Sequence, residues 1–329
     1  MKNYTSDSSI QGRGAIPPII NKTLNLNVLT KNISARPEKP STPQHSTKLP
    51  FLSLINDEPT HIRRILYYKP EVSAKSWIIT DGTTGNLIDG FNENEAREIA
   101  SLTKIMTCII VIQDVIKYKK SFDEHVFISE NAGLMDGTRA GLSCGDSLKV
   151  WDLLHGLMLP SGNDAAVALA EYFGGLISLN NPISHFVAKM NGLARVLKLN
   201  DTIFRNPHGM STSLNISSAK SISQLTLYAL KMPIFCKIVS TYSYTGTVVN
   251  NGIQRKISWI NTNRLLRKGF SGVKTGYTPA AGPCLCSYIE QRNKKLLIVM
   301  LNVKSMQSRW AEAMKLWKWA NAHILQYKN

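Results

Sequence analysis

The chain has 329 residues, 43% of them hydrophobic, and a formal net charge of +17 at pH 7. This length allows one large domain or two modest ones with a real core, and the charge favours an anionic partner. No run reaches the roughly 18 apolar residues of a membrane span, and no RNA-binding aromatic signature, paired zinc motif or basic region with heptads occurs. We therefore expect no transmembrane segment and no nucleic-acid partner.

Residues 1–60 are rich in Asn, Ser, Thr, Lys and Pro, a composition typical of a disordered tail. They contain no continuous apolar stretch of the kind that a secretory signal peptide needs. The five cysteines are odd in number and form no Cys-x-x-Cys pair, so we predict neither a disulfide framework nor a structural zinc site. We therefore expect a disordered tail at 1–60 and a folded domain at 61–329.

Regular structure is predicted from residue 62 onward. It begins with strands at 76–80 and 87–91, joined by a turn at 81–85. Helices are predicted at 101–118, 183–199 and 217–230. Residues 151–175 are predicted to form two helices with a break at 160–163. The last third has strand patterns at 242–249, 253–259, 272–274, 284–289 and 296–303, and a final helix at 308–325. This order predicts an α+β fold and not alternating βαβ units.

The first chemical motif is Ser101-Leu102-Thr103-Lys104, at the start of an apolar segment. If a helix begins at Ser101, Lys104 lies on the same face one turn later. Apolar surroundings weaken proton binding by a lysine, and the neutral amine can then accept the proton of the serine, which becomes a nucleophile without a histidine. The same spacing recurs at Ser217/Lys220 and Ser271/Lys274, so without its apolar context Ser101 would be read as an ordinary helix N-cap.

Two further motifs follow. Ser161-Gly162-Asn163 interrupts a helical pair and could hold a hydroxyl and an amide over a cleft; the alternative is a capped turn, as for Ser213-Leu214-Asn215. Lys274-Thr275-Gly276 lies in a predicted strand and offers a cation and a hydroxyl to a carboxylate-bearing ligand. Its glycine lets a substrate approach the backbone.

In this order, the three motifs are the set shared by penicillin-binding proteins and class A β-lactamases. Residues 68–325, which contain these motifs and also Asn206-Pro207-His208-Gly209, resemble the low-mass penicillin-binding proteins. These proteins are the serine-type D-alanyl-D-alanine carboxypeptidases of peptidase family S11. The resemblance implies a β-lactamase/transpeptidase-like fold: an antiparallel sheet flanked by helices, plus a mainly helical subdomain. It also implies that the domain at 61–329 is catalytic.

The resemblance implies roles for the motif residues. Ser101 would attack the carbonyl between the two terminal D-alanines of a peptidoglycan stem peptide, with Lys104 as the base. Ser161 and Asn163 would relay protons and orient the peptide. No cofactor or metal would be needed, and β-lactam antibiotics would bind covalently.

The strand motif would bind the other end of the substrate. Lys274 would support the proton network and the substrate carboxylate, and Thr275 would hydrogen-bond that carboxylate beside Gly276. The N–H groups of Ser101 and Tyr277 would form the oxyanion hole. Arg309 matches a further carboxylate ligand, although Trp310 follows where the family is usually polar. The family acts outside the cytoplasm and commonly carries a signal peptide and a second, β-rich domain; neither is visible here, so the location stays open.

Three alternatives remain at this stage. Gly141-Leu142-Ser143-Cys144-Gly145 matches the nucleophile elbow of α/β-hydrolases, but no strand-like sequence precedes it. A β-lactamase would need a water-activating glutamate after Ser161-Gly162-Asn163, and the chain has no glutamate between Glu171 and Glu290. The third alternative is a non-catalytic module that binds cell-wall fragments, and the filled catalytic positions argue against it.

Overall fold

The computed structural model describes residues 69–210, 215–291 and 293–326, with side chains as far as 322. These residues belong to one compact unit, 57–329. The boundary expected at residue 60, and the disordered tail before it, lie outside the described residues and stay predictions.

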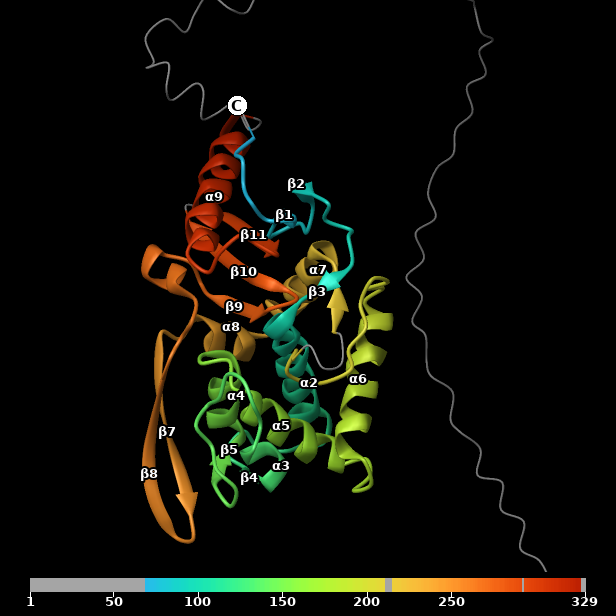
Figure 1. Ribbon diagram of the computed structural model, residues 1–329, viewed down its shortest axis with the longest axis vertical. Helices are drawn as coiled ribbons and strands as arrows, with labels where there is room; N and C mark the ends of the chain where they lie inside the picture. Colours follow the sequence, from blue (N-terminus) through green and yellow to red (C-terminus); the bar gives the residue numbers. More distant parts are fainter. Residues whose placement is uncertain (1–68, 211–214, 292, 327–329) are drawn as a thin grey trace, which may run out of the picture. The chain divides into compact units, whose positions relative to one another are not determined.

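The main sheet has five antiparallel strands in the order β2-β1-β11-β10-β9 (Figure 1). Its strands are β1 (Ser76–Asp81), β2 (Leu87–Phe91), β9 (Val273–Thr278), β10 (Gly282–Gln291) and β11 (Lys294–Leu301). All five were expected from the sequence, with ends that differ by a few residues. Strand β9 forms one edge of the sheet and carries the Lys274-Thr275-Gly276 motif.

Alternation along the central strands places apolar side chains on both faces of this sheet. Leu296, Ile298 and Met300 pack with the final helix, α9 (Ser308–Gln326), through its Leu316 and Trp319. The alternate residues of β11 enter the larger core on the other face. That face is covered by α7 (Ala219–Ala229), and the two helices α9 and α7 lie on opposite sides of the sheet in Figure 1.

The helical part follows β2 in the chain. It consists of α2 (Thr103–Lys117), α3 (Glu130–Gly133), α4 (Val150–Met158), α5 (Asn163–Gly175) and α6 (Pro182–Val196). The apolar segment predicted to be a buried helix is α2, in which nearly every side chain is buried. The expected α+β fold, with an antiparallel sheet flanked by helices and a mainly helical subdomain, is confirmed.

Several short elements were not expected from the sequence. They are β3 (Arg97–Glu98), which pairs with β6 (Ile216–Ser217), then β4 (His125–Phe127), β5 (Ser147–Lys149) and α8 (Pro233–Ser240). The expected strands β7 (Ser243–Asn250) and β8 (Ile253–Ile260) form a hairpin that joins β4 and β5 in a separate four-stranded sheet.

None of the described helices is, by itself, long and apolar enough to cross a membrane. Helices α7 and α8 pass that test only as a pair, and they bend by 111° at the break between them. Helix α7 is mostly buried in the core described above, which accounts for its apolar composition.

Candidate active site

Ser101 lies in a short 3-10 turn, η1 (Ala100–Leu102), directly before α2. The prediction that the helix begins at Ser101 is therefore wrong by two residues, and the Ser101 hydroxyl caps neither element. Ala100 has a φ of +47°, a conformation that is unfavourable for alanine and fixes the direction of the next residue. A Cβ added at Gly209 would lie only 2.0 Å from the carbonyl oxygen of Ala100. The glycine therefore allows the 206–209 loop to pack against this turn.

Lys104 is fully buried beneath Ser101. Its Nζ lies 3.0 Å from Ser101 Oγ, 2.7 Å from Asn163 Oδ1 and 2.8 Å from the His208 carbonyl oxygen. Burial lowers the pKa of Lys104 well below the ordinary lysine value, and the charge of Lys274 lowers it further, against the opposing effect of Asp164. The apolar sequence predicted this effect on the amine. By contrast, Lys220, in the repeated Ser-x-x-Lys spacing, is exposed and bonds Asn94.

The Ser161-Gly162-Asn163 motif forms the bend between α4 and α5. Asn163 is buried, and besides accepting from Lys104 its Nδ2 donates to the Asp136 carbonyl at 2.7 Å, which fixes the amide orientation. Ser161 has a φ of +72°, a strained value for serine, and its buried hydroxyl has no hydrogen-bond partner among the described residues. Strain and an unused buried hydroxyl together are typical of a group reserved for a ligand.

The Lys274-Thr275-Gly276 motif lies on the edge strand β9, against the turn that holds Ser101. A Cβ added at Gly276 would lie 3.1 Å from the Ser101 backbone nitrogen, so this glycine allows β9 to reach the nucleophile turn. This contact is a structural role for Gly276, and the approach of substrate to its backbone stays a prediction. Lys274 is buried and donates to the Thr275 carbonyl at 2.9 Å, and Thr275 Oγ1 lies 2.8 Å from Thr262 Oγ1. Tyr277 is half exposed.

Arg309 reaches the same strand from the first turn of α9. Its guanidinium is buried, donates to the Gly276 carbonyl at 3.3 Å and lies 4.3 Å from the centre of the Trp310 ring. Trp310 therefore contacts the guanidinium by a cation–π interaction, which accounts for an aromatic residue at this position. Burial, together with the charge of Arg309, lowers the pKa of Lys274 to about 7.

Lys274 makes the stability of the protein depend on pH. Because its pKa is about 7 in the folded state and 10.5 ordinarily, the unfolded state binds more protons between these values, and stability rises with pH. From about pH 7 to about pH 8.5 the contribution of Lys274 to the free energy of unfolding should grow by about 1 to 2 kcal/mol. Urea unfolding of wild type and Lys274→Met at both pH values measures it, and equal increases in the two proteins would contradict the assignment. The buried Cys108, Cys284 and Cys286, whose pKa values are raised, act with the opposite sign as pH approaches 9, but they are present in both proteins and cancel in the comparison.

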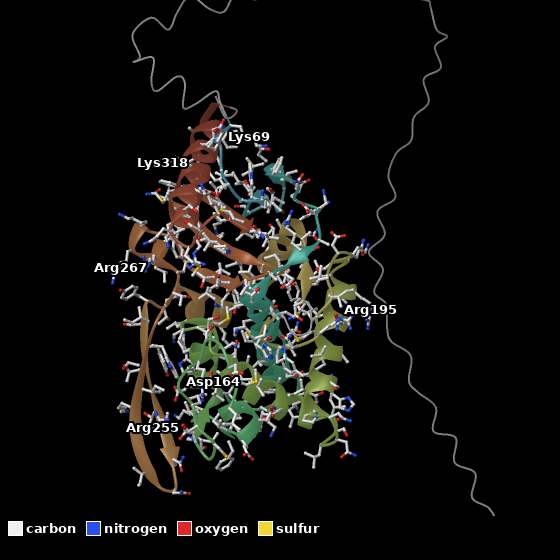
Figure 2. All side chains as sticks on the ribbon, in the orientation of Figure 1. Lys69, Asp164, Arg195, Arg255, Arg267 and Lys318 are labelled. Atoms are coloured by element: carbon white, nitrogen blue, oxygen red, sulfur yellow. The ribbon has the colours of Figure 1, made fainter. Side chains whose placement is uncertain are left out.

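Asp164 supports the site and was not identified as functional from the sequence. It is fully buried in the helical part of the molecule (Figure 2) and accepts hydrogen bonds from the backbone nitrogens of Ala140, Gly141 and Leu142 at 2.8 to 3.1 Å. These bonds attach the 140–142 loop to the start of α5, next to Asn163. No sequence pattern reveals this role, because the bonded residues lie more than 20 positions earlier in the chain.

The structure next to this loop argues against the α/β-hydrolase alternative. Ser143 is exposed, its backbone nitrogen donates to the Asp146 side chain, and residues 134–142 directly before it form no strand. A nucleophile elbow needs a strand there. As for metals, no three His, Cys, Asp or Glu side chains are grouped to hold an ion in the part of the chain that the structure describes.

Comparison with known proteins identifies the family. The D-alanyl-D-alanine carboxypeptidase family matches residues 65–305. The chain is 33% identical over 245 residues to the D-alanyl-D-alanine carboxypeptidase DacF of Bacillus subtilis, covering 74% of this chain and 61% of that protein. It is 32% identical to DacD of Escherichia coli, covering 78% of this chain and 65% of that protein. The chain thus spans a little under two thirds of these relatives.

Solved structures give the same result. The DD-transpeptidase of Streptomyces K15 superposes with a TM-score of 0.74 at 31% identity, covering 78% of this chain and 99% of that one. The carboxypeptidase DacD of Francisella tularensis superposes with a TM-score of 0.69 at 28% identity, covering 77% of this chain and 71% of that one. The motifs, the fold and these matches together place the chain in the D-alanyl-D-alanine carboxypeptidase family, peptidase family S11.

Proposed function

We propose that this protein is a serine-type D-alanyl-D-alanine carboxypeptidase that removes the terminal D-alanine from peptidoglycan stem peptides. The observation that carries the proposal is the buried amine of Lys104, held between Ser101 Oγ, Asn163 Oδ1 and the His208 carbonyl. Few structural roles call for a fully buried lysine with no carboxylate bonded to it, and its lowered pKa suits a general base.

In the proposed reaction, neutral Lys104 donates its two protons to Asn163 and His208, and its lone pair accepts the proton of Ser101. Ser101 Oγ bonds to the carbonyl carbon of the penultimate D-alanine, and the oxyanion is stabilised by the N–H groups of Ser101 and Tyr277. The peptide C–N bond then breaks, and the proton reaches the leaving amine through the Ser161 hydroxyl. Water hydrolyses the Ser101 ester and regenerates the enzyme.

The substrate would bind along β9. As an edge strand, β9 offers unpaired backbone groups to an extended peptide. Lys274, Thr275 and Arg309 would contact the terminal carboxylate, because they supply two cations and a hydroxyl next to the Ser101 turn. Gly276 would keep this strand close to the nucleophile. β-Lactams, which also carry a carboxylate beside a reactive carbonyl, would acylate Ser101.

The rate of deacylation, the hydrolysis of the Ser101 ester, distinguishes the proposed carboxypeptidase from a β-lactamase. Between Glu171 and Glu290 the chain has no glutamate to activate water behind the ester, so the penicillin adduct should be long-lived. We also propose that the catalytic domain is 61–329, and that no metal or other cofactor takes part. EDTA should then leave activity unchanged.

The test combines fluorescent penicillin labelling with D-alanine release from an acylated peptide that ends in D-Ala–D-Ala. We expect a stable adduct, which peptide mass analysis locates on Ser101, together with D-alanine release. Peptide binding without release or adduct would replace the proposal with a binding module. Nitrocefin hydrolysis at the rate of a true β-lactamase would replace it with that activity.

A further inference from the structure

A cavity of about 1040 Å³ adjoins β9 beside the proposed carboxylate site. Its lining includes Thr262, which contacts Thr275, and Arg309, which bonds Gly276. The cavity therefore adjoins the place where the carboxylate of a departing D-alanine would lie, and Ser101 is not among its lining residues. In the proposed reaction, the departing D-alanine reaches no further than this carboxylate. The cavity is therefore additional space that the D-alanine does not fill.

Cations dominate the polar part of this cavity. Arg264, Arg267 and Lys268 line it together with Arg309, and no Asp or Glu is among its lining residues. We call these four residues the basic cluster. None of the four is ion-paired with a carboxylate in the described part of the chain. Figure 2 shows Arg267 on the segment between β8 and β9, at the outer side of the molecule.

The cluster is held in place by uncharged neighbours. Arg267 donates to the Tyr242 hydroxyl and lies over its ring, and Arg264 donates to the Gln307 side chain at 3.4 Å. Three of the cations belong to the short helix η3 (Arg264–Lys268), whose first turn is capped by the Asn263 side chain. The cations therefore line one wall of the cavity on an ordered segment.

Arg309 connects the cluster to the catalytic strand. Its Nε is buried and has no hydrogen-bond partner among the described residues, so one donor of a buried guanidinium is unused. Burial lowers the pKa of Arg309 to about 10, and the charge of Arg264 lowers it too. Arg309 in turn lowers the pKa of Lys274. Positive charges that disfavour one another in this way would be stabilised by an added anion.

We infer that the basic cluster forms an anion-binding subsite for the leaving residue, and that the protein prefers peptides whose C-terminal D-residue carries a second carboxylate in its side chain. The inference rests on the proposed function. The terminal carboxylate would occupy the position at Thr275 and Arg309, and the side-chain carboxylate would lie among Arg264, Arg267 and Lys268. Ile260 and Met306 supply an apolar wall for the methylene groups that join the two.

The test measures binding to Ser101→Ala protein, in which no peptide is cleaved. Two acylated peptides are compared, one ending in D-Ala–D-Glu and one in D-Ala–D-Gln, which match in shape and differ in charge. NMR titration at low salt should give a Kd about fivefold to tenfold lower for the D-Glu peptide. The ratio should decline as salt is added, because exposed cations are screened.

Removing two cations should abolish the preference. In the Ser101→Ala background, Arg267→Gln combined with Lys268→Gln should bring the Kd ratio to about one. The matched control is Lys315→Gln with Lys318→Gln, which removes the same charge from exposed positions on α9 that do not line the cavity. The control should keep the wild-type ratio.

Equal Kd values for the two peptides would overturn the inference, as would a preference that survives loss of Arg267 and Lys268. A preference lost in the control pair as well would overturn it in favour of general attraction by the net positive charge. D-Alanine release by the wild-type protein is scored separately and tests the proposed function. Because binding to Ser101→Ala needs no chemistry, failure of the inference and failure of the proposed function give different results.

Discussion

Replacing Ser101 by alanine is expected to abolish the penicillin adduct and to lower D-alanine release at least about a thousandfold. The change removes the only atom that forms a bond to substrate in the proposed reaction. The side chain is small and its hydroxyl caps neither η1 nor α2, so the thermal unfolding temperature should change little. Gel labelling with fluorescent penicillin and a D-alanine assay on the two proteins measure the effect.

Ser143→Ala is the matched control for this experiment. Ser143 stands in the Gly-x-Ser-x-Gly motif, which matches the pattern of a different class of serine nucleophile, and its side chain is exposed. The control should label and hydrolyse like wild type. An adduct that persists in Ser101→Ala, or that disappears in Ser143→Ala, would mean that the nucleophile is assigned to the wrong serine.

The main sheet and long helices were predictable because each carries its own periodic pattern. Strand β11 alternates between two apolar cores, and α2 is an apolar run too long for a strand. Strands β3 and β6 have two residues each, and α3 has four. Segments this short contain no full period, so they form only because tertiary contacts align them.

The candidate site, like the fold, was predictable only in part. The sequence predicted the types of the site residues and their order in the chain. It did not predict the strained backbone conformations of the site or the contacts that hold the site in place. The turn at Ala100, whose φ is positive, packs against the distant Gly209, and the 140–142 loop is hydrogen-bonded to Asp164. The sequence predicted a helix start at Ser101 because a short 3-10 turn before an apolar helix has no distinct composition. Such features arise from packing between segments far apart in the chain.

Lys104→Met should lower the rate of penicillin acylation about a hundredfold to ten-thousandfold, the usual contribution of a general base. Methionine fills much of the same buried volume without an amine, so Ser101 keeps its place and loses its proton acceptor. The Asn163 Oδ1 and His208 carbonyl would lose a donor, which costs about 1 to 3 kcal/mol of stability. Methionine no longer requires burial of a polar amine, which offsets part of this cost, so the variant should still fold. Stopped-flow acylation and urea unfolding measure the two effects.

The pH dependence distinguishes a base from a structural residue. In wild type, acylation should slow as pH falls, because Lys104 takes up a proton, and the midpoint should lie well below the ordinary lysine pKa. In Lys104→Met this dependence should vanish along with most of the rate. Lys220→Met, at the exposed lysine of the repeated Ser-x-x-Lys spacing, is the control and should keep both the rate and the pH profile.

If Lys104→Met acylated within about tenfold of wild type and with the same decrease in rate at low pH, Ser101 would have to be activated by another group. Lys274, the other buried amine of the site, would then be the next residue to replace.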